Sequence, residues 1–431
     1  MCVYFLLSLG VASAARKTMF FLPVILLLSA KALSQTIQLD FVVQELKDGH
    51  LPLSSRLHAR NIELPVFNDF PTQRYLFNIM AGNPPQSFTI MIDSGSADLW
   101  LPSPTSPGCL ESCPPGTFDV HASGTAVDIH IPYNVSFGLT PDNIMLGEYY
   151  NDTVTIGGAT LLNQSFAVAE VTEAEMIHWG IMGLGTVYRS SAYDNPKSPT
   201  YRSASRSPLP VWLNLHRQGI IEKKIFSVWL NSQDAATGTL LLGGIDDAKY
   251  EGELKSTPVL LSGPEQVFME WLVQFTSVAR VDNEGKREDL TASNWTLEAI
   301  VDTGSPNMYL PSSLYDSIAS PLNATTHPTA NTPYVPCSLR SSSEYLEWVF
   351  AGRDEEDGPA IRMPYSEMIY SFGMPANLGE VRSEDGVELC YLGVIPWDGP
   401  IVLVGAVLIR NAYVVFDGEA VELRMAQVKI D

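Results

Sequence analysis

The stretch Phe88-Thr89-Ile90-Met91-Ile92-Asp93-Ser94-Gly95-Ser96 decides how the fold of this chain is interpreted, because its pattern occurs twice. Ala299-Ile300-Val301-Asp302-Thr303-Gly304-Ser305 repeats the apolar run, the aspartate, the hydroxyl residue, the glycine and the serine, and the two aspartates are 209 residues apart. Short β-branched and aromatic runs that end at a turn are typical of strands. Two such turns predict that the fold brings two carboxylates together, and they indicate a hydrolase that uses a carboxylate pair.

The chemistry of such a pair follows from charge. Two carboxylates about 3 Å apart cannot both ionise cheaply, so they share a proton and titrate as a coupled pair. The ionised member can accept a proton from a water molecule between them. The protonated member can polarise a scissile carbonyl and later supply the leaving amine. We therefore predict Asp93 and Asp302 as joint acid and base, with no metal and no cofactor.

The residues around the two aspartates are expected to support them. Each glycine permits a tight turn. The hydroxyl residue before each glycine is expected to donate across the interface of two lobes, and the serine after it to donate to a carboxylate. In chain order these supporting residues are Ser94, Gly95, Ser96, Thr303, Gly304 and Ser305.

Length and charge narrow the class of protein. The 431 residues are too many for one small core and suit two lobes of ordinary domain size, and the apolar content of 45% predicts a packed globule. Without the three basic residues of the first 34 positions, 23 basic residues face 48 acidic ones, a net charge of about −25. Such a charge repels nucleic acid and anionic lipid, so neither is expected as a partner. Carboxylates protonate in acid, which favours an acidic working environment.

Of the two ends of the sequence, only the N-terminal one matches the pattern of a targeting or anchoring segment. Residues 1–34 combine basic residues, two short apolar runs and small residues without Asp or Glu, which predicts a signal peptide cleaved before Gln35, with Met1 or Met19 as the start. Residues 35–65 are poorly patterned and are interpreted as a lead-in or propeptide. The last residues, 424–431, form no hydrophobic tail, so no stable membrane anchor is expected.

Cysteines and sequons fit secretion. Cys2 leaves with the signal peptide, and the four remaining cysteines allow three pairings. Proximity along the chain favours Cys109–Cys113 and Cys337–Cys390, one bridge in each lobe. Histidine spacing for a zinc site is lacking, so no metal is expected. Five Asn-x-Ser/Thr sequons predict N-glycosylation at Asn134, Asn151, Asn163, Asn294 and Asn323.

Strand patterns dominate the rest of the chain. Helical periodicity is rare, with the best candidates at Pro210–Gln218 and Ser312–Ala319, which predicts a mostly β protein with a few short helices. The segment Ser190–Pro208 is poor in apolar periodicity and is predicted as a solvated surface loop.

An internal repeat extends beyond the two turns. Ile181-Met182-Gly183-Leu184-Gly185 follows the first turn and Val402-Leu403-Val404-Gly405 follows the second, and a glycine in such a run lets another backbone approach closely. The same order of elements in both halves predicts two lobes related by a pseudo-two-fold axis, with the dyad between them. We assign residues 66–246 to the N-terminal lobe and 247–431 to the C-terminal lobe.

From about Tyr75 to Val428 the chain resembles the pepsin family of aspartic proteases, in the style of fungal secreted or vacuolar members. The resemblance implies a bilobal β fold, a cleft for an extended peptide, and zymogen-derived endopeptidase activity at low pH. It rests on stretches that flank both turns and close each half, namely residues 81–86, Ala97–Ser103, Ile225–Leu230, Leu242–Asp246, Val404-Gly405 and Leu408–Asp417.

The chain departs from the family pattern in the flap, a hairpin whose tip carries a tyrosine that hydrogen-bonds a tryptophan, here Trp100. The stretch Tyr133-Asn134-Val135-Ser136-Phe137-Gly138 fits best with Phe137 at the tyrosine position, and a second register places Tyr133 there. The phenylalanine keeps open a catalytically weak or silent relative that binds peptides or a partner protein through the cleft.

Two further departures are interpreted as packing differences. Ala406 stands where an acidic residue is common, and Trp179 stands where the family often has Asp. The expected protein is a monomeric, secreted or extracellular endopeptidase that acts on polypeptides, with the vacuolar lumen as the alternative location.

Overall fold

The computed structural model describes residues 36–41, 56–58, 61–63, 65–69 and 74–430, except residues 110–112, 114, 138–143, 172–178, 264, 328–331, 354–355 and 377. Contacts divide the chain into residues 1–33 and residues 34–431, and everything below concerns the second unit. The predicted signal peptide and part of residues 35–65 therefore lie outside the described residues.

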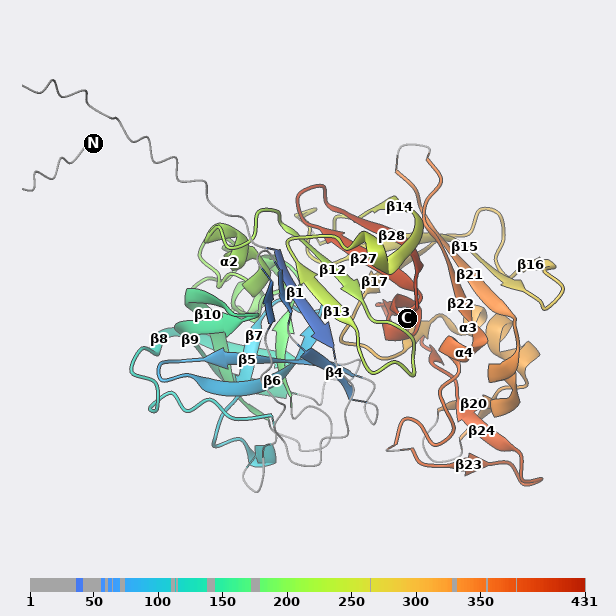
Figure 1. Cartoon of the computed structure of the whole chain (residues 1–431), viewed down its shortest axis with the longest axis horizontal. Helices are drawn as coiled ribbons and strands as arrows, with labels where there is room; N and C mark the ends of the chain where they lie inside the picture. The colour runs from blue at the N-terminus through green and yellow to red at the C-terminus, as the bar shows by residue number, and fades with distance from the viewer. Residues whose placement is uncertain are drawn as a thin grey trace, which may run out of the picture. The chain divides into compact units, whose positions relative to one another are not determined.

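The largest sheet joins strands from both halves of the sequence. Its order is β14-β28-β27-β12-β13-β1-β4-β5-β6-β11-β7-β10-β9-β8, with β3 also paired to β1 and β2 paired to β3. The antiparallel pair of β12 and β27 connects the halves, and Figure 1 shows these strands between β5–β10 and the group of β15, β21 and β22. Its strands are β1 Thr36–Phe41, β2 Arg56–His58, β3 Asn61–Glu63, β4 Pro65–Asp69, β5 Arg74–Ala81, β6 Gln86–Asp93, β7 Leu99–Pro102, β8 Val127–Ser136, β9 Ile144–Ile156, β10 Ala159–Val171, β11 Gly180–Gly183, β12 Ile225–Trp229, β13 Thr239–Leu242, β14 Tyr250–Pro258, β27 Ala412–Asp417 and β28 Glu422–Val428.

Two smaller sheets belong to the C-terminal half. One has the order β22-β21-β15-β17-β26-β18-β25 with β16 beside β15, and the other has the order β19-β20-β24-β23. Their strands are β15 Leu272–Val281, β16 Arg287–Asp289, β17 Leu297–Val301, β18 Met308–Leu310, β19 Thr325–Thr326, β20 Pro333–Pro336, β21 Tyr345–Phe350, β22 Ala360–Pro364, β23 Val381–Arg382, β24 Glu388–Tyr391, β25 Val394–Pro396 and β26 Leu403–Val404.

Helices are few and short, as the sequence predicts. The two predicted helices are present as α2 and α3, each within one residue of its predicted ends. The α-helices are α1 Ser191–Asp194, α2 Val211–Arg217, α3 Ser312–Ala319, α4 Tyr365–Met368 and α5 Ala406–Ile409. The 3-10 turns are η1 Pro107–Cys109, η2 Val187–Arg189, η3 Asp247–Lys249, η4 Ser320–Leu322 and η5 Cys337–Ser341.

The internal repeat is visible in the strand pairing. In the first half, β11 runs parallel to β6 and antiparallel to β7. In the second half, β26 runs parallel to β17 and antiparallel to β18 in the same way. The structure confirms the predicted class, a mostly β protein with two lobes related by pseudo-two-fold symmetry.

Glycines permit the close approach of the strands in both halves. A Cβ at Gly183 would lie 2.3 Å from the carbonyl carbon of Ala97, and a Cβ at Gly405 would lie 2.2 Å from the carbonyl oxygen of Asn307. No side chain fits at such distances, so both positions require glycine. The turn that follows each aspartate is thereby packed directly on the neighbouring strand.

The prediction of a solvated loop at Ser190–Pro208 is wrong for its first part. This segment contains α1, and Ser190, Ala192 and Tyr193 are buried. The Ser190 side chain accepts a hydrogen bond from Ala192 N and caps the helix. A single helical turn shows no apolar periodicity, which is why the sequence pattern does not reveal it.

Candidate active site

The two aspartate turns meet face to face. Asp93 ends β6 and Asp302 directly follows β17, so the strand core fixes each residue from behind. A Cβ added to Gly95 would lie 2.7 Å from Asp302 Oδ1, and one added to Gly304 would lie 2.5 Å from Asp93 Oδ1. Each carboxylate therefore lies against the glycine of the opposite turn, and a larger residue at either glycine would displace it.

Hydrogen bonds between the turns repeat the two-fold symmetry. Ser94 N donates to Thr303 Oγ1 at 3.0 Å, and Thr303 N donates to Ser94 Oγ at 2.9 Å. The same hydroxyls donate onward, Ser94 Oγ to Val301 O at 2.8 Å and Thr303 Oγ1 to Ile92 O at 3.3 Å. Both hydroxyl side chains are buried. These four hydrogen bonds connect the two turns to each other and to the strands behind them.

The amides and one hydroxyl of the turns contact the carboxylates. Gly95 N donates to Asp93 Oδ1 at 2.8 Å, and Gly304 N donates to Asp302 Oδ1 at 2.9 Å. Ser96 Oγ donates to Asp93 Oδ2 at 2.5 Å. These donors favour the ionised form of a carboxylate.

Ser305 differs from the prediction. Its hydroxyl donates to the carbonyl oxygen of Asn307 at 3.3 Å instead of to Asp302. The bend at residues 305–307 offers this local acceptor, and Ala406 N fixes the bend by donating to Ser305 O at 2.8 Å. The two turns are therefore unequal, because a serine hydroxyl contacts Asp93 and none from Ser305 contacts Asp302.

Burial and the neighbouring carboxylate determine the protonation of Asp302. Burial raises the pKa of Asp302 well above its ordinary value, and the charge of Asp93 and a hydrogen bond with it raise this pKa further. The amides of Gly304 and Gly95 oppose the effect. The geometry thus favours Asp302 as the member that keeps the shared proton.

The hairpin of β8 and β9 carries the predicted flap residues. The Phe137 ring lies 6.1 Å from the Trp100 ring, centroid to centroid. Trp100 Nε1 is buried and has no hydrogen-bond partner among the described residues. Tyr133 is buried beside Tyr149, with ring centroids 5.5 Å apart, and its hydroxyl also has no partner in the described part of the chain. The contact between Phe137 and Trp100 agrees with the register in which Phe137 takes the tyrosine position. The other predicted flap residue, Gly138, lies outside the described residues.

A buried connection that the sequence does not reveal ties this hairpin to the first turn. Ser191 N donates to Asp98 Oδ2 at 2.8 Å, and Ser191 Oγ donates to Asn134 O at 2.9 Å. Asn134 N in turn donates to Ser191 Oγ at 3.0 Å. Burial raises the pKa of Asp98 despite these hydrogen bonds. Its partners are 93 residues away in the chain, so no local pattern marks them.

The other two departures from the family pattern pack as predicted. Ala406 is buried in α5, where its backbone holds the second turn. Trp179 is half-buried against the apolar cluster of Leu76, Met91 and Trp100. Neither residue contacts the aspartates through a hydrogen bond or ion pair in the described part of the structure.

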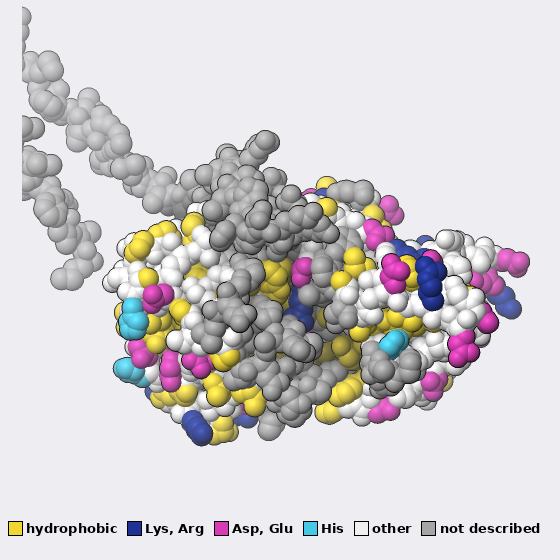
Figure 2. All heavy atoms as spheres, turned by 90° about the horizontal axis from the view of Figure 1, so that it is seen from below, with side chains coloured by type: hydrophobic (Ala, Val, Ile, Leu, Met, Phe, Trp, Pro, Cys, Tyr) yellow, Lys and Arg dark blue, Asp and Glu magenta, His cyan; other side chains and the backbone are white. Residues whose placement is uncertain are grey.

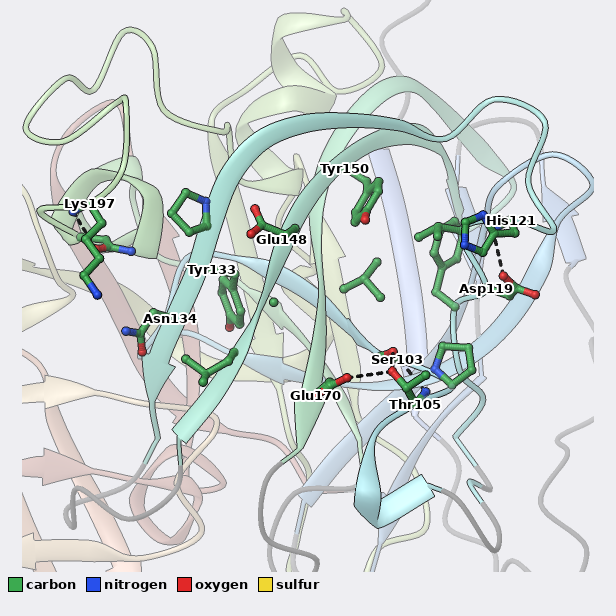
Figure 3. A pocket seen from close by; sticks show the side chains of 18 residues that line it. Ser103, Thr105, Asp119, His121, Tyr133, Asn134, Glu148, Tyr150, Glu170 and Lys197 are labelled. Atoms are coloured by element: carbon green, nitrogen blue, oxygen red, sulfur yellow. Dashed lines mark hydrogen bonds between the residues drawn. The ribbon is translucent and has the colours of Figure 1, made fainter.

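A groove of about 710 Å³ lies on the N-terminal half (Figure 3), but it is separate from the aspartates. Pro132, Asn134, Glu148 and Tyr150 of the β8–β9 hairpin line it, and none of the residues of the two turns does. The chemistry of the two carboxylates is therefore to be found between the turns and not in this groove.

Disulfides join the pairs that chain proximity favours, Cys109–Cys113 and Cys337–Cys390. Among the described residues, no group of three or more His, Cys, Asp or Glu side chains could hold a metal ion. No helix in the described ranges is long and apolar enough to cross a bilayer. Of the five sequon asparagines, Asn134, Asn163, Asn294 and Asn323 are exposed and Asn151 is half-buried.

Comparisons with known proteins agree with this geometry. Residues 74–428 match the sequence model of the family described as eukaryotic aspartyl protease. The chain therefore belongs to the eukaryotic aspartyl protease family.

Its relatives include fungal proteases. A probable aspartic-type endopeptidase OPSB of Arthroderma benhamiae is 28% identical over 85% of this chain and 71% of the relative. Candidapepsin of Candida tropicalis is 28% identical over 93% of this chain and 90% of the relative. The crystal structure of the aspartic proteinase from Irpex lacteus has the same fold, with a TM-score of 0.66 and 20% identity over 85% of this chain and 97% of the other.

Proposed function

We propose that Asp93 and Asp302 form one catalytic unit that activates water for peptide-bond hydrolysis. The chain is an aspartic-type endopeptidase by family. The observation that supports this assignment is that each carboxylate lies against the turn of the other. The raised pKa of Asp302 agrees with a shared proton. This is the arrangement that a shared-proton acid and base requires.

The ionised member of the pair takes a proton from the attacking water, and the water oxygen bonds to the scissile carbonyl carbon. Asp302, in its protonated form, donates to the carbonyl oxygen as negative charge develops there. The leaving amine then takes a proton from the pair, the C–N bond breaks, and two peptides leave. The hydrogen bonds between Ser94 and Thr303 hold the carboxylates in register throughout.

Because Asp302 must carry its proton, we expect the enzyme to be active at acidic pH. As pH rises through the raised pKa of Asp302, the proton is lost and two like charges face each other, so no acid remains to donate to the carbonyl oxygen. The excess of carboxylates on the face shown in Figure 2 agrees with an acidic working environment, because acid relieves their mutual repulsion.

The test is cleavage of acid-denatured casein or haemoglobin by purified wild-type protein and by the Asp93→Asn variant across acidic pH. We expect the wild type to cleave, the variant to lose activity, and a statin-type peptide inhibitor with a tetrahedral hydroxyl to block the wild type. Cleavage by Asp93→Asn at the wild-type rate would refute the assignment. The alternative of a binding-only relative has no support in the geometry, since both turns are intact.

We further propose that the protein is a monomer in a secreted or extracellular location, with the vacuolar lumen as the alternative. Two disulfides and four exposed sequon asparagines support an oxidising, glycosylating compartment. Mass spectrometry before and after enzymatic deglycosylation tests Asn134, Asn151, Asn163, Asn294 and Asn323. An unchanged mass would refute glycosylation.

The proposed division of the chain is a signal peptide of residues 1–34, a propeptide of residues 35–65, and lobes of residues 66–246 and 247–431. Within the lead-in, β1 pairs with β13 and with β4, so this strand lies inside the main sheet. N-terminal sequencing after acid incubation tests both boundaries, and an N-terminus unchanged by acid would argue against self-processing.

A further inference from the structure

An arginine stands beside the first aspartate turn and takes no part in the proposed mechanism. In the antiparallel ladder of β5 and β6, Leu76 lies opposite Met91. Continuing this register by two residues places Arg74, the first residue of β5, opposite Asp93 at the end of β6. Arg74 Nη1 lies 3.8 Å from the sulfur Sδ of Met91, two residues before the aspartate, so the guanidinium lies beside this end of the strand.

Charged groups from both halves of the chain interact with Arg74. Burial lowers its pKa, while the charges of Asp69, Asp93, Tyr309 and Asp302 act in the opposite direction. Asp69 is its cross-strand neighbour on β4, and Tyr309 belongs to β18 of the C-terminal half. An arginine stays protonated in proteins, so a fixed cation stands at the site where the two halves meet.

Among the described residues, the Arg74 guanidinium has more hydrogen-bond donors than acceptors. It carries five N–H groups in a planar fork. Nε is buried and donates to no residue that the structure describes, and Nη1 has only a thioether sulfur, a weak acceptor, as its partner. Buried donors without partners are rare in folded proteins. The side chain as a whole is only half-buried, so a ligand can complete its bonding.

We propose that Arg74 binds an acidic side chain of the substrate, and that the enzyme therefore prefers peptides with Asp or Glu close to the scissile bond. A carboxylate matches the guanidinium fork with two parallel hydrogen bonds. Elsewhere the acidic surface repels acidic peptides, so this cation determines which of them reach the aspartates. The proposal rests on the proposed protease function and adds a substrate class to it.

The test uses pairs of peptides with one cleavable bond that differ only by Glu or Gln at a single position. The position is moved over roughly four residues on either side of the bond, because each residue of an extended chain advances the side chain by only ~3.3 Å. Rates are measured at about pH 5, where glutamate with an ordinary pKa near 4.3 is mostly ionised. We expect kcat/KM to be at least about tenfold higher for the Glu peptide at one position.

Three variants assign the preference to the side chain. Arg74→Gln is expected to remove it, and Arg74→Lys to keep part of it, because lysine retains the charge but not the fork. Arg206→Gln, at an exposed arginine on a surface turn, is the matched control and is expected to keep the full preference. If Arg74→Gln does not fold, the wild-type preference is measured against salt, and a charge-based preference must weaken as salt rises.

The outcomes separate this proposal from the proposed function. Cleavage of Glu and Gln peptides at equal rates at every position would overturn the role of Arg74 and leave the protease assignment intact. In Arg74→Gln, the pH optimum could shift equally for both peptides while the ratio of their kcat/KM values stays unchanged. This result would also overturn the proposal, because the arginine would then act only on the aspartates. Cleavage of no peptide by the wild type would instead refute the proposed function, and this proposal with it.

Discussion

At the scale of single residues, two hydroxyl groups connect the turns that carry the two carboxylates. Ser94 and Thr303 exchange backbone-to-hydroxyl bonds across the lobes. Both are buried, so water cannot replace a lost partner. This brace sets the distance between the aspartates, and the charge coupling that raises the pKa of Asp302 depends on that distance.

The Ser94→Ala variant tests the brace. It leaves Thr303 N buried without an acceptor, and we expect the free energy of unfolding to fall by about 1–3 kcal/mol. The activity should fall by at least about tenfold, because small displacements of reacting groups are costly. Urea unfolding and peptide kinetics measure both. Ser94→Thr, which keeps the hydroxyl, is the control; an equal loss in the two variants would contradict the role of the hydroxyl group.

At the scale of elements, the β8–β9 hairpin shows what the change from tyrosine to phenylalanine does. Phe137 packs on Trp100, but it offers no oxygen to the buried Trp100 Nε1. The hairpin is nevertheless held at Asn134, three residues before Phe137, through Ser191, which also donates to Asp98. The end of β8 that leads to Phe137 is therefore fixed by hydrogen bonds, whereas the Phe137 ring contributes only an apolar contact.

The Phe137→Tyr variant should add the missing acceptor. A hydroxyl on this ring can accept from Trp100 Nε1, and one net hydrogen bond corresponds to about 0.5–1.5 kcal/mol. We expect kcat/KM to rise by about threefold to tenfold in peptide assays. Phe137→Leu, which removes the ring, should lower it. An unchanged or lower value for Phe137→Tyr would show that Phe137 does not take the family's tyrosine position.

The sequence predicts elements that carry their signal locally. The two aspartate turns follow strand patterns, and α2 and α3 have helical periodicity, so all of them are found. Arg74 is not predicted, because its position beside Asp93 depends on the register of two strands. Asp98 and Ser191 are likewise missed, since 93 residues separate them. The repeated pattern predicts the same role for Ser305 as for Ser96, and only the bend at residues 305–307 shows that the Ser305 hydroxyl donates to Asn307 O instead.

At the scale of the whole molecule, a buried ion pair joins the halves. Arg410 is fully buried, and its Nε donates to Glu367 Oε2 at 3.1 Å. The same carboxylate oxygen accepts from Gln233 N at 2.9 Å, and Gln233 follows β12 of the first half. The pair therefore links the connecting sheet to the C-terminal half.

Removal of one partner of this pair should be costly. Glu367→Ala leaves the Arg410 charge buried and unpaired, and we expect a loss of about 3–5 kcal/mol in the free energy of unfolding. Glu388→Ala breaks the exposed pair with Arg382 and is the control, with an expected loss of about 0–1 kcal/mol. Urea unfolding compares them, and equal losses would contradict a structural role for the buried pair.

Stability should also depend on pH through Asp302. Its pKa is raised on folding, so the folded state binds this proton more tightly than the unfolded state. The resulting stabilisation is fully present below the ordinary aspartate pKa of about 3.9 and is lost as pH rises through the raised value. Calorimetry should show Tm falling from acidic toward neutral pH, with a smaller fall in Asp302→Asn. The same fall in both proteins would assign the effect to the overall charge instead.

The central claim is that Asp93 and Asp302 act as one unit, and a comparison of single and double variants tests it most directly. The measurement is kcat/KM for one peptide with Asp93→Asn, Asp302→Asn and the double variant. Residues that act as a unit give strongly non-additive losses, so we predict that each single variant loses nearly as much activity as the double variant. Activity that survives in either single variant, or losses that multiply in the double variant, would contradict the account.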